Sequence, residues 1–148
     1  MPKLDLDQLP VTNRTGYPSP FDRAVAGRWN RRLGPAGGLT DFGASHVTLE
    51  PGAWSSQRHV HERDDEFLVM LSGEAVLVED DGRTVLRHGD CVTFPKGGSA
   101  HHLINESDQP CSFIAVGVPD SGDVRYPDID LRVDFATQRF VHKDGTPY

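Results

Sequence analysis

The chain contains 148 residues with a formal net charge of −7, and 36% of its residues are hydrophobic and 25% charged. This length allows one hydrophobic core, and the composition is too apolar for a disordered chain and too polar for a membrane protein. Because the negative charge would repel a phosphate backbone, we expect no nucleic-acid partner. The acidic N-terminus lacks the basic end and apolar run of a secretory signal, so we expect a cytoplasmic protein with no membrane partner.

The first 22 residues are rich in residues that interrupt helices. These are Pro2, Pro10, Gly16, Pro18 and Pro20. We therefore expect residues 1–22 to form an extended arm, and residues 23–148, including the C-terminal stretch, to form a single domain. Such an arm cannot build a core alone, and open sheet edges pair readily, so we expect a homodimer.

The densest basic stretch of the chain follows the arm. Its members are Arg23, Arg28, Arg31 and Arg32. Val25, Gly27 and Trp29 interrupt this stretch, so we interpret it as the solvated edge of a strand.

Short apolar runs separated by glycine and proline make up the rest of the chain. Fifteen Gly and eleven Pro separate stretches rich in Val, Leu and Phe, which is typical of strands joined by tight turns. The expected strands cover residues 45–49, 66–71, 74–79, 84–87, 91–94, 101–105, 112–118 and 129–135. This spacing predicts an all-β sandwich or barrel. Cys91 and Cys111 form no CxxC pair, and we expect both to be small buried groups.

Histidines and a glutamate lie at positions that strand geometry can bring together. His59 and His61 are two residues apart, so in a strand both imidazoles lie on the same face. Glu66 follows a polar loop and can enter from the next strand. His101 and His102 are neighbours, so a regular strand directs only one of them to that face. One histidine alone would be expected on the surface, but this combination indicates a metal site.

Two sequence motifs resemble those of the cupin superfamily. GAWSSQRHVHERDDEFLVMLSG at residues 52–73 is similar to the first cupin motif, with one extra residue in the first spacer. GDCVTFPKGGSAHHLIN at residues 89–105 is similar to the second motif, with one residue added before His101. The resemblance implies the cupin double-stranded β-helix, which is a jelly-roll barrel. It also implies one divalent metal ion held by His59, His61, Glu66 and His101. We assign His101 rather than His102 because His101 keeps the three-residue spacing to Asn105.

The expected ligands limit the choice of metal. Three imidazoles and one carboxylate suit Mn(II), Fe(II), Ni(II), Cu(II) or Zn(II) better than Ca(II) or Mg(II), and the sequence does not choose among them. Four protein ligands would leave two positions of an octahedral ion open for water or substrate. Gln57 shares a strand face with His59, so it either orients a water or substrate in the pocket or bonds to the backbone. His102 is the other candidate for a place beside the site.

The sequence leaves three functions open. The first is a metal-dependent enzyme with isomerase, epimerase or lyase chemistry on a small sugar-like or hydroxy-keto acid substrate, because an ion that binds two adjacent oxygens stabilises an enediolate. The second is an Fe(II)-dependent dioxygenase. The third is a non-catalytic cupin that binds or senses a small molecule. No sequence feature identifies a catalytic base.

Overall fold

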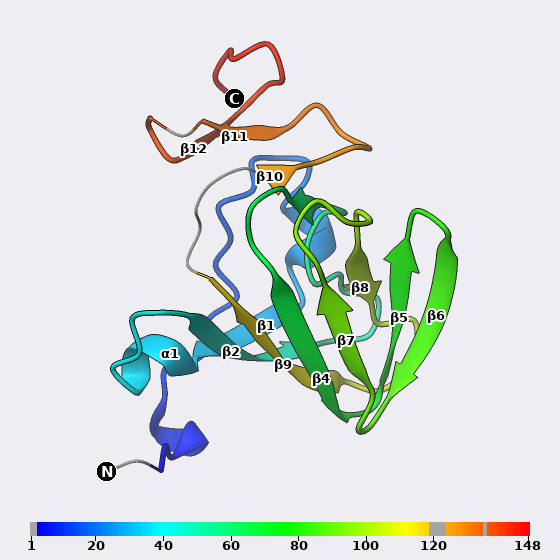
Figure 1. Cartoon of the computed structure of the whole chain (residues 1–148). Helices are drawn as coiled ribbons and strands as arrows, with labels where there is room; N and C mark the ends of the chain where they lie inside the picture. The colour runs from blue at the N-terminus through cyan, green and yellow to red at the C-terminus, as the bar shows by residue number, and fades with distance from the viewer. Residues whose placement is uncertain (1–2, 119–123, 135) are drawn as a thin grey trace.

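The computed structural model describes residues 3–118, 124–134 and 136–148, and its described strands form three antiparallel sheets (Figure 1). The five-stranded sheet has the order β1-β2-β9-β4-β7. Its strands are β1 (Arg28–Arg32), β2 (Gly43–Leu49), β4 (Glu66–Ser72), β7 (Cys91–Phe94) and β9 (Cys111–Gly117). The three-stranded sheet has the order β6-β5-β8, with β5 (Glu74–Glu79), β6 (Gly82–Arg87) and β8 (His102–Ile104). These two sheets face each other and enclose the core (Figure 1).

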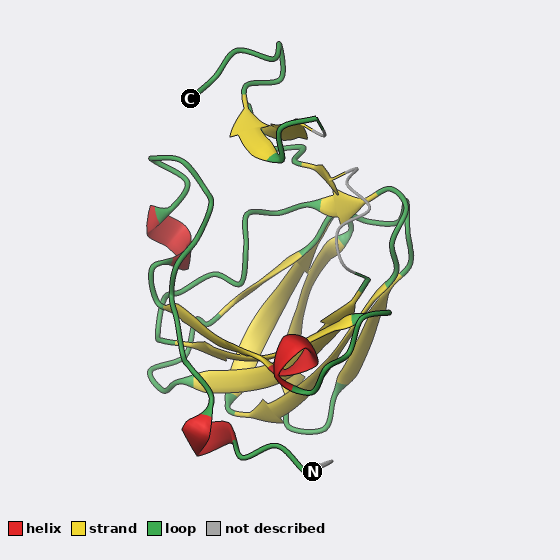
Figure 2. Ribbon diagram, turned by 90° about the vertical axis from the view of Figure 1, so that its left-hand side faces the viewer, coloured by secondary structure: helices red, strands yellow, loops and turns green. Residues whose placement is uncertain are grey.

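A third sheet lies over one end of this barrel. It has the order β12-β11-β10-β3, with β3 (Val60–His61), β10 (Val124–Arg125), β11 (Arg132–Asp134) and β12 (Arg139–Val141). Three short helices complete the described elements, namely η1 (Leu6–Gln8), η2 (Arg23–Val25) and α1 (Leu33–Ala36). Figure 2 shows the C-terminal strands standing above the two main sheets. None of the described helices is long and apolar enough to cross a membrane.

The predicted all-β class is confirmed, and most expected strands are present within one or two residues of their predicted bounds. The strand expected at 129–135 is shorter, Arg132–Asp134, and residue 135 lies outside the described residues. The strand expected at 101–105 begins at His102, because His101 instead forms an isolated bridge with His59. Helix α1 was not predicted. Its Pro35 lies in the first turn, where a missing N–H breaks no helical hydrogen bond.

Alternation along the strands builds the core. On β4, Leu68 and Met70 point inward and are buried, whereas Phe67 points outward and is 39% exposed. Buried side chains from both main sheets meet between them, including Leu49, Leu68, Met70, Leu77, Leu103 and Phe113. Gly73 joins β4 to β5 at a φ of 68°, and a Cβ there would lie 2.7 Å from the Pro110 carbonyl oxygen. Only glycine fits this turn without displacing the backbone.

The expectation for the cysteines is half right. Cys111 is buried, and burial raises the pKa of its thiol to about 11. Cys91 is exposed, which corrects the prediction. It lies on the edge strand β7, where Val92 and Phe94 take the inward positions and Cys91 therefore faces outward. Both thiols are free.

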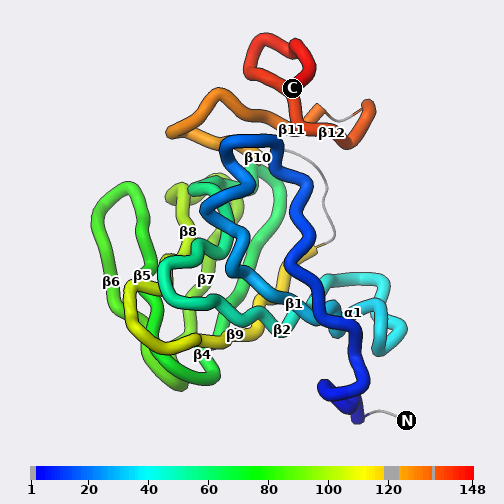
Figure 3. The backbone as a smooth tube through the Cα atoms, turned by 180° about the vertical axis from the view of Figure 1, so that it is seen from behind, coloured from blue at the N-terminus to red at the C-terminus, as the bar shows by residue number. Residues whose placement is uncertain are grey.

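The N-terminal arm lies along the back of the barrel and reaches the end covered by β10 (Figure 3). The backbone of Thr12 pairs with that of Asn30 on β1, through N–H to O distances of 3.1 and 2.9 Å. Further along, Tyr17 packs against Phe140 of β12 with ring centroids 5.1 Å apart. The arm and the C-terminal strands therefore close the same end of the barrel.

Candidate metal centre and its cavity

Three of the predicted ligands form a compact cluster. His59 lies just before β3, His61 lies in β3, and Glu66 is the first residue of β4. The two Nε2 atoms of the histidines are 3.2 Å apart. The Glu66 carboxylate lies 3.7 Å from His59 Nε2 through Oε2 and 3.5 Å from His61 Nε2 through Oε1. One ligand atom from each residue lies within 4.8 Å of the others, so these three groups could hold one ion.

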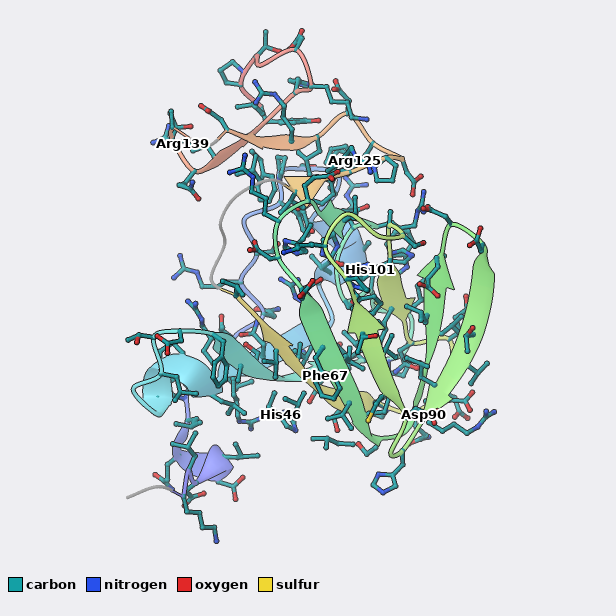
Figure 4. All side chains as sticks on the ribbon, viewed as in Figure 1. His46, Phe67, Asp90, His101, Arg125 and Arg139 are labelled. Atoms are coloured by element: carbon teal, nitrogen blue, oxygen red, sulfur yellow. The ribbon has the colours of Figure 1, made fainter. Side chains whose placement is uncertain are left out.

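His101 joins the cluster through the glutamate. Its Nε2 lies 3.1 Å from Glu66 Oε2, and its backbone pairs with that of His59. Its ring stacks on Phe94, with centroids 3.6 Å apart and an angle of 6° between the planes. Figure 4 places His101 at the end of the barrel near Arg125, whereas Asp90 lies at the opposite end. The structure therefore brings all four predicted ligands together, and their binding of a metal stays a prediction.

The hydrogen bonds of the rings decide which nitrogens face the centre. His59 Nδ1 lies 3.0 Å from the Gln57 carbonyl oxygen, and His101 Nδ1 lies 3.1 Å from that of Ser99. A carbonyl only accepts, so each Nδ1 carries a proton, and Nε2 is the nitrogen that faces the centre and would bind a metal in place of its own proton. A second contact, 3.1 Å from His59 Nδ1 to Ser56 Oγ, also holds the His59 ring. Imidazole nitrogens that converge beside a carboxylate form a donor set that a divalent transition metal fits.

Glu66 is poised to remain ionised. Burial raises the pKa of the Glu66 carboxyl. Hydrogen bonds from His101 and His59, together with the charge of His61, lower that pKa by more than burial raises it. The net result is a pKa well below the usual range. The cluster thus presents a carboxylate at neutral pH, as metal binding requires.

The two residues expected beside the site lie away from its centre. The His102 ring packs edge-on against Trp54 at 4.5 Å, and its Nδ1 lies 3.1 Å from the Ser56 carbonyl oxygen. Burial lowers the pKa of His102, so the ring is held neutral. Gln57 is buried, and its Nε2 donates to the Phe21 carbonyl oxygen at 2.9 Å. Gln57 thus follows the backbone-bonded alternative and fastens the arm.

A cavity of about 330 Å³ adjoins the cluster, and His59, Glu66 and His101 form part of its wall. Much of its lining is apolar and comes from Val47, Leu68, Phe94, Leu103, Phe113 and Ala115. A cavity that is largely apolar, with few polar groups, is typical of a small-molecule site.

Polar residues of β1 form another part of the cavity wall, and sequence reasoning missed them. Arg28, Asn30 and Arg32 line the cavity, which the interpretation of the basic stretch as a solvated strand edge did not include. That interpretation holds in part, because β1 is an edge strand and Arg23 and Arg32 are exposed. Arg31 lies on the opposite face, paired in register with His46 of β2. The physical reason is the pairing of β1 with β2, which puts alternate residues of RWNRR inward. The alternation of residues along this strand is the sequence signal that could have predicted the inward positions of Arg28, Asn30 and Arg32.

Two tyrosines from distant parts of the chain lie beside the cluster. The hydroxyls of Tyr17 and Tyr126 are 3.4 Å apart, and the Tyr126 ring centroid is 6.1 Å from that of His59. Burial raises the pKa of Tyr17, so its hydroxyl stays protonated at neutral pH. No sequence pattern joins residues 109 positions apart, so these tyrosines could not be predicted.

Comparisons with known proteins agree with the fold. The family model for the cupin domain matches residues 45–117. A solved structure from Silicibacter pomeroyi, described as a sugar phosphate isomerase of the cupin superfamily, is 41% identical with a TM-score of 0.92, covering 99% of this chain and 96% of that one. A structure from Acidithiobacillus ferrooxidans, provisionally assigned as a sugar phosphate isomerase, is 30% identical with a TM-score of 0.68, covering 71% and 68%. The polyketide cyclase RemF of Streptomyces resistomycificus shares the fold at 19% identity, with a TM-score of 0.70 and 87% of each chain covered. No curated protein matches the sequence.

The protein is therefore a small jelly-roll barrel with a candidate metal site at one end, formed by imidazoles and a carboxylate. The chain belongs to the cupin superfamily. The predicted fold and family are thus confirmed.

Proposed function

We propose that the protein is a divalent-metal-dependent isomerase or epimerase that acts on a small sugar-like substrate. One observation carries this proposal: the Nε2 atoms of the histidines and the Glu66 carboxylate converge at the wall of a cavity large enough for a small molecule. The relative described as a sugar phosphate isomerase supports it, because that similarity extends over nearly the whole of both chains.

Each part of the site has a role in this reaction. His59, His61, Glu66 and His101 would hold the ion, and a bound ion would act as a Lewis acid on adjacent substrate oxygens. The Tyr17 hydroxyl lies 3.4 Å from that of Tyr126, and its raised pKa keeps it protonated, so it would not act as the base. The apolar side chains of the cavity exclude water from the reacting carbons.

The experiment follows proton exchange at carbon. Purified protein is loaded with each of the five candidate metals and incubated in D2O with a panel of aldoses, ketoses and their phosphates, and deuterium incorporation is followed by NMR. We expect exchange next to the carbonyl with at least one substrate, its loss on adding a chelator, and its loss in Glu66→Gln. The matched control, His88→Ala, alters an exposed histidine outside the cluster and should keep exchange.

Two results would contradict the proposal. One is exchange that survives both the chelator and Glu66→Gln. The other is oxygen consumption, measured in parallel with an electrode, in place of isomerisation, which would favour the dioxygenase.

The homodimer and the cytoplasmic location stay predictions. An apolar groove on the outer side of β4 and β7, lined by Phe42, Phe67 and Val118 among others, supports the dimer because such a surface favours burial. The mass of the purified protein in solution, measured by light scattering, tests the dimer.

A further inference from the structure

We propose that the inward face of β1, formed by Arg28, Asn30 and Arg32, binds a phosphate group of the substrate. This inference rests on the proposed function, in which the substrate is sugar-like. It adds that the substrate carries a phosphate group. None of the predicted site residues lies on β1.

The three side chains share one face and one cavity. They occupy positions i, i+2 and i+4 of a strand, and they stand in register with Leu49, Val47 and Ser45 of β2. The same cavity is lined by His59, Glu66 and His101. A molecule held on β1 therefore lies in the space that the ligand cluster borders.

The two arginines on this face lack acidic partners. Within the described part of the chain, no salt bridge involves Arg28 or Arg32, and the same holds for Arg31 on the opposite face of the strand. The shortage is not of acids, since 22 Asp and Glu outnumber 15 Lys and Arg. Two cations left unpaired at a cavity wall would be stabilised by an anion.

Arg28 has an unsatisfied donor beside the cavity, as Arg31 does on the opposite face. Arg28 donates from one terminal nitrogen to the Ser55 carbonyl oxygen at 2.8 Å, but its Nε is buried without a hydrogen-bond partner in the described residues. Burial also lowers the pKa of the guanidinium, which reflects poorly compensated positive charge. An oxyanion at this position would supply the missing acceptor.

The geometry and charge favour phosphate. Guanidinium groups bind phosphate oxygens in a bidentate manner, and the Asn30 amide lies between the two arginines as a further donor. The Cα atoms of residues 28 and 32 are about 13 Å apart in an extended strand, so both side chains can converge on a group near Asn30. Two positive charges match a phosphate dianion better than a carboxylate.

The test measures binding of inorganic phosphate to the metal-loaded protein by calorimetry. We expect a dissociation constant in the millimolar range for the unaltered protein, raised about tenfold or more in Arg28→Gln and in Arg32→Gln. Arg31→Gln is the matched control, because it removes the same charge from the opposite face of the same strand. We expect it to leave the dissociation constant unchanged. Since Arg28 also holds the Ser55 carbonyl, Arg28→Lys, which keeps the charge, should recover part of the affinity.

Two further arms separate this inference from the proposed function. In His59→Ala, which weakens the metal site, phosphate binding should persist; if it instead follows the metal and ignores Arg28 and Arg32, the inference is wrong while the metal-dependent function stands. Acetate, titrated in the same way, should bind more weakly than phosphate. Acetate binding as tight as phosphate would overturn the phosphate assignment in favour of a carboxylate.

Discussion

The cavity has two polar regions in its wall, and the chain builds them in different ways. One region carries His59, Glu66 and His101, and the other carries Arg28 and Arg32. In the first region, the histidine rings are oriented by their own backbone, since His59 and His101 each direct Nδ1 to the carbonyl oxygen two residues earlier. In the second, the direction of the side chains depends on the backbone pairing of β1 with Thr12 of the arm and with strand β2.

This difference explains why only one region could be recognised beforehand. The ligand residues stand at fixed spacings in the sequence, and a motif consists of such spacings. The direction of a basic strand depends on which strand it pairs with, and one shift of register would turn Arg28 outward and Arg31 inward.

Breaking the ligand region should give the largest effect. We expect His101→Ala to lower the metal content of the purified protein by more than about tenfold, because it removes one of the gathered donors. His102→Ala is the matched control, since its ring packs on Trp54 away from the centre. Elemental analysis of both variants decides this. Equal metal loss in a folded His102→Ala protein would show that the ligand assignment is wrong.

Much of the fold followed from the sequence because its determinants are local. Short apolar runs bounded by glycine and proline predicted most strands, and the spacing around His59, Glu66 and His101 predicted which side chains meet. The strand expected at His101 begins only at His102, yet the bridge to His59 still brings the His101 ring beside Glu66.

What could not be predicted depends on contacts between distant segments. Tyr17 and Tyr126 meet only because the arm and the C-terminal strands close the same end of the barrel. Gln57 was expected on the strand face of His59, yet it lies in a bend and its amide donates to the Phe21 carbonyl of the arm. The exposure of Cys91 depends on β7 being an edge strand.

An intermediate effect is expected from the outward neighbour of His59. Arg58 donates two hydrogen bonds of 2.7 Å to the Asp128 carboxylate and also pairs with Asp80, and its side chain is only 16% exposed. Arg58→Ala should lower the free energy of unfolding by about 1–2 kcal/mol, because it breaks a bidentate pair that joins distant segments. Unfolding in urea measures this.

A matched control for that variant is Arg83→Ala. Arg83 also forms a direct ion pair, with Glu106, but its side chain is 52% exposed. The decrease in the free energy of unfolding should therefore stay within about 0.5 kcal/mol. Metal content should be unchanged in both variants. Equal destabilisation by the two changes would mean that burial of the Arg58 pair contributes nothing.

The smallest effect should come from loosening the arm over the arginine region. Thr12→Pro removes the N–H that donates to the Asn30 carbonyl, so we expect faster amide exchange at Asn30 and an increase of about two- to threefold in the dissociation constant for phosphate. Thr12→Ala keeps the backbone pair and loses only a hydroxyl that accepts from the Arg14 N–H, so exchange at Asn30 should stay slow. Metal content should not change in either protein, because the ligand rings are held by their own backbone. Metal loss in Thr12→Pro would contradict the independence of the two regions, and slow exchange at Asn30 in that variant would show that the Thr12 carbonyl still accepts from the Asn30 N–H, so that the arm does not depend on the lost bond.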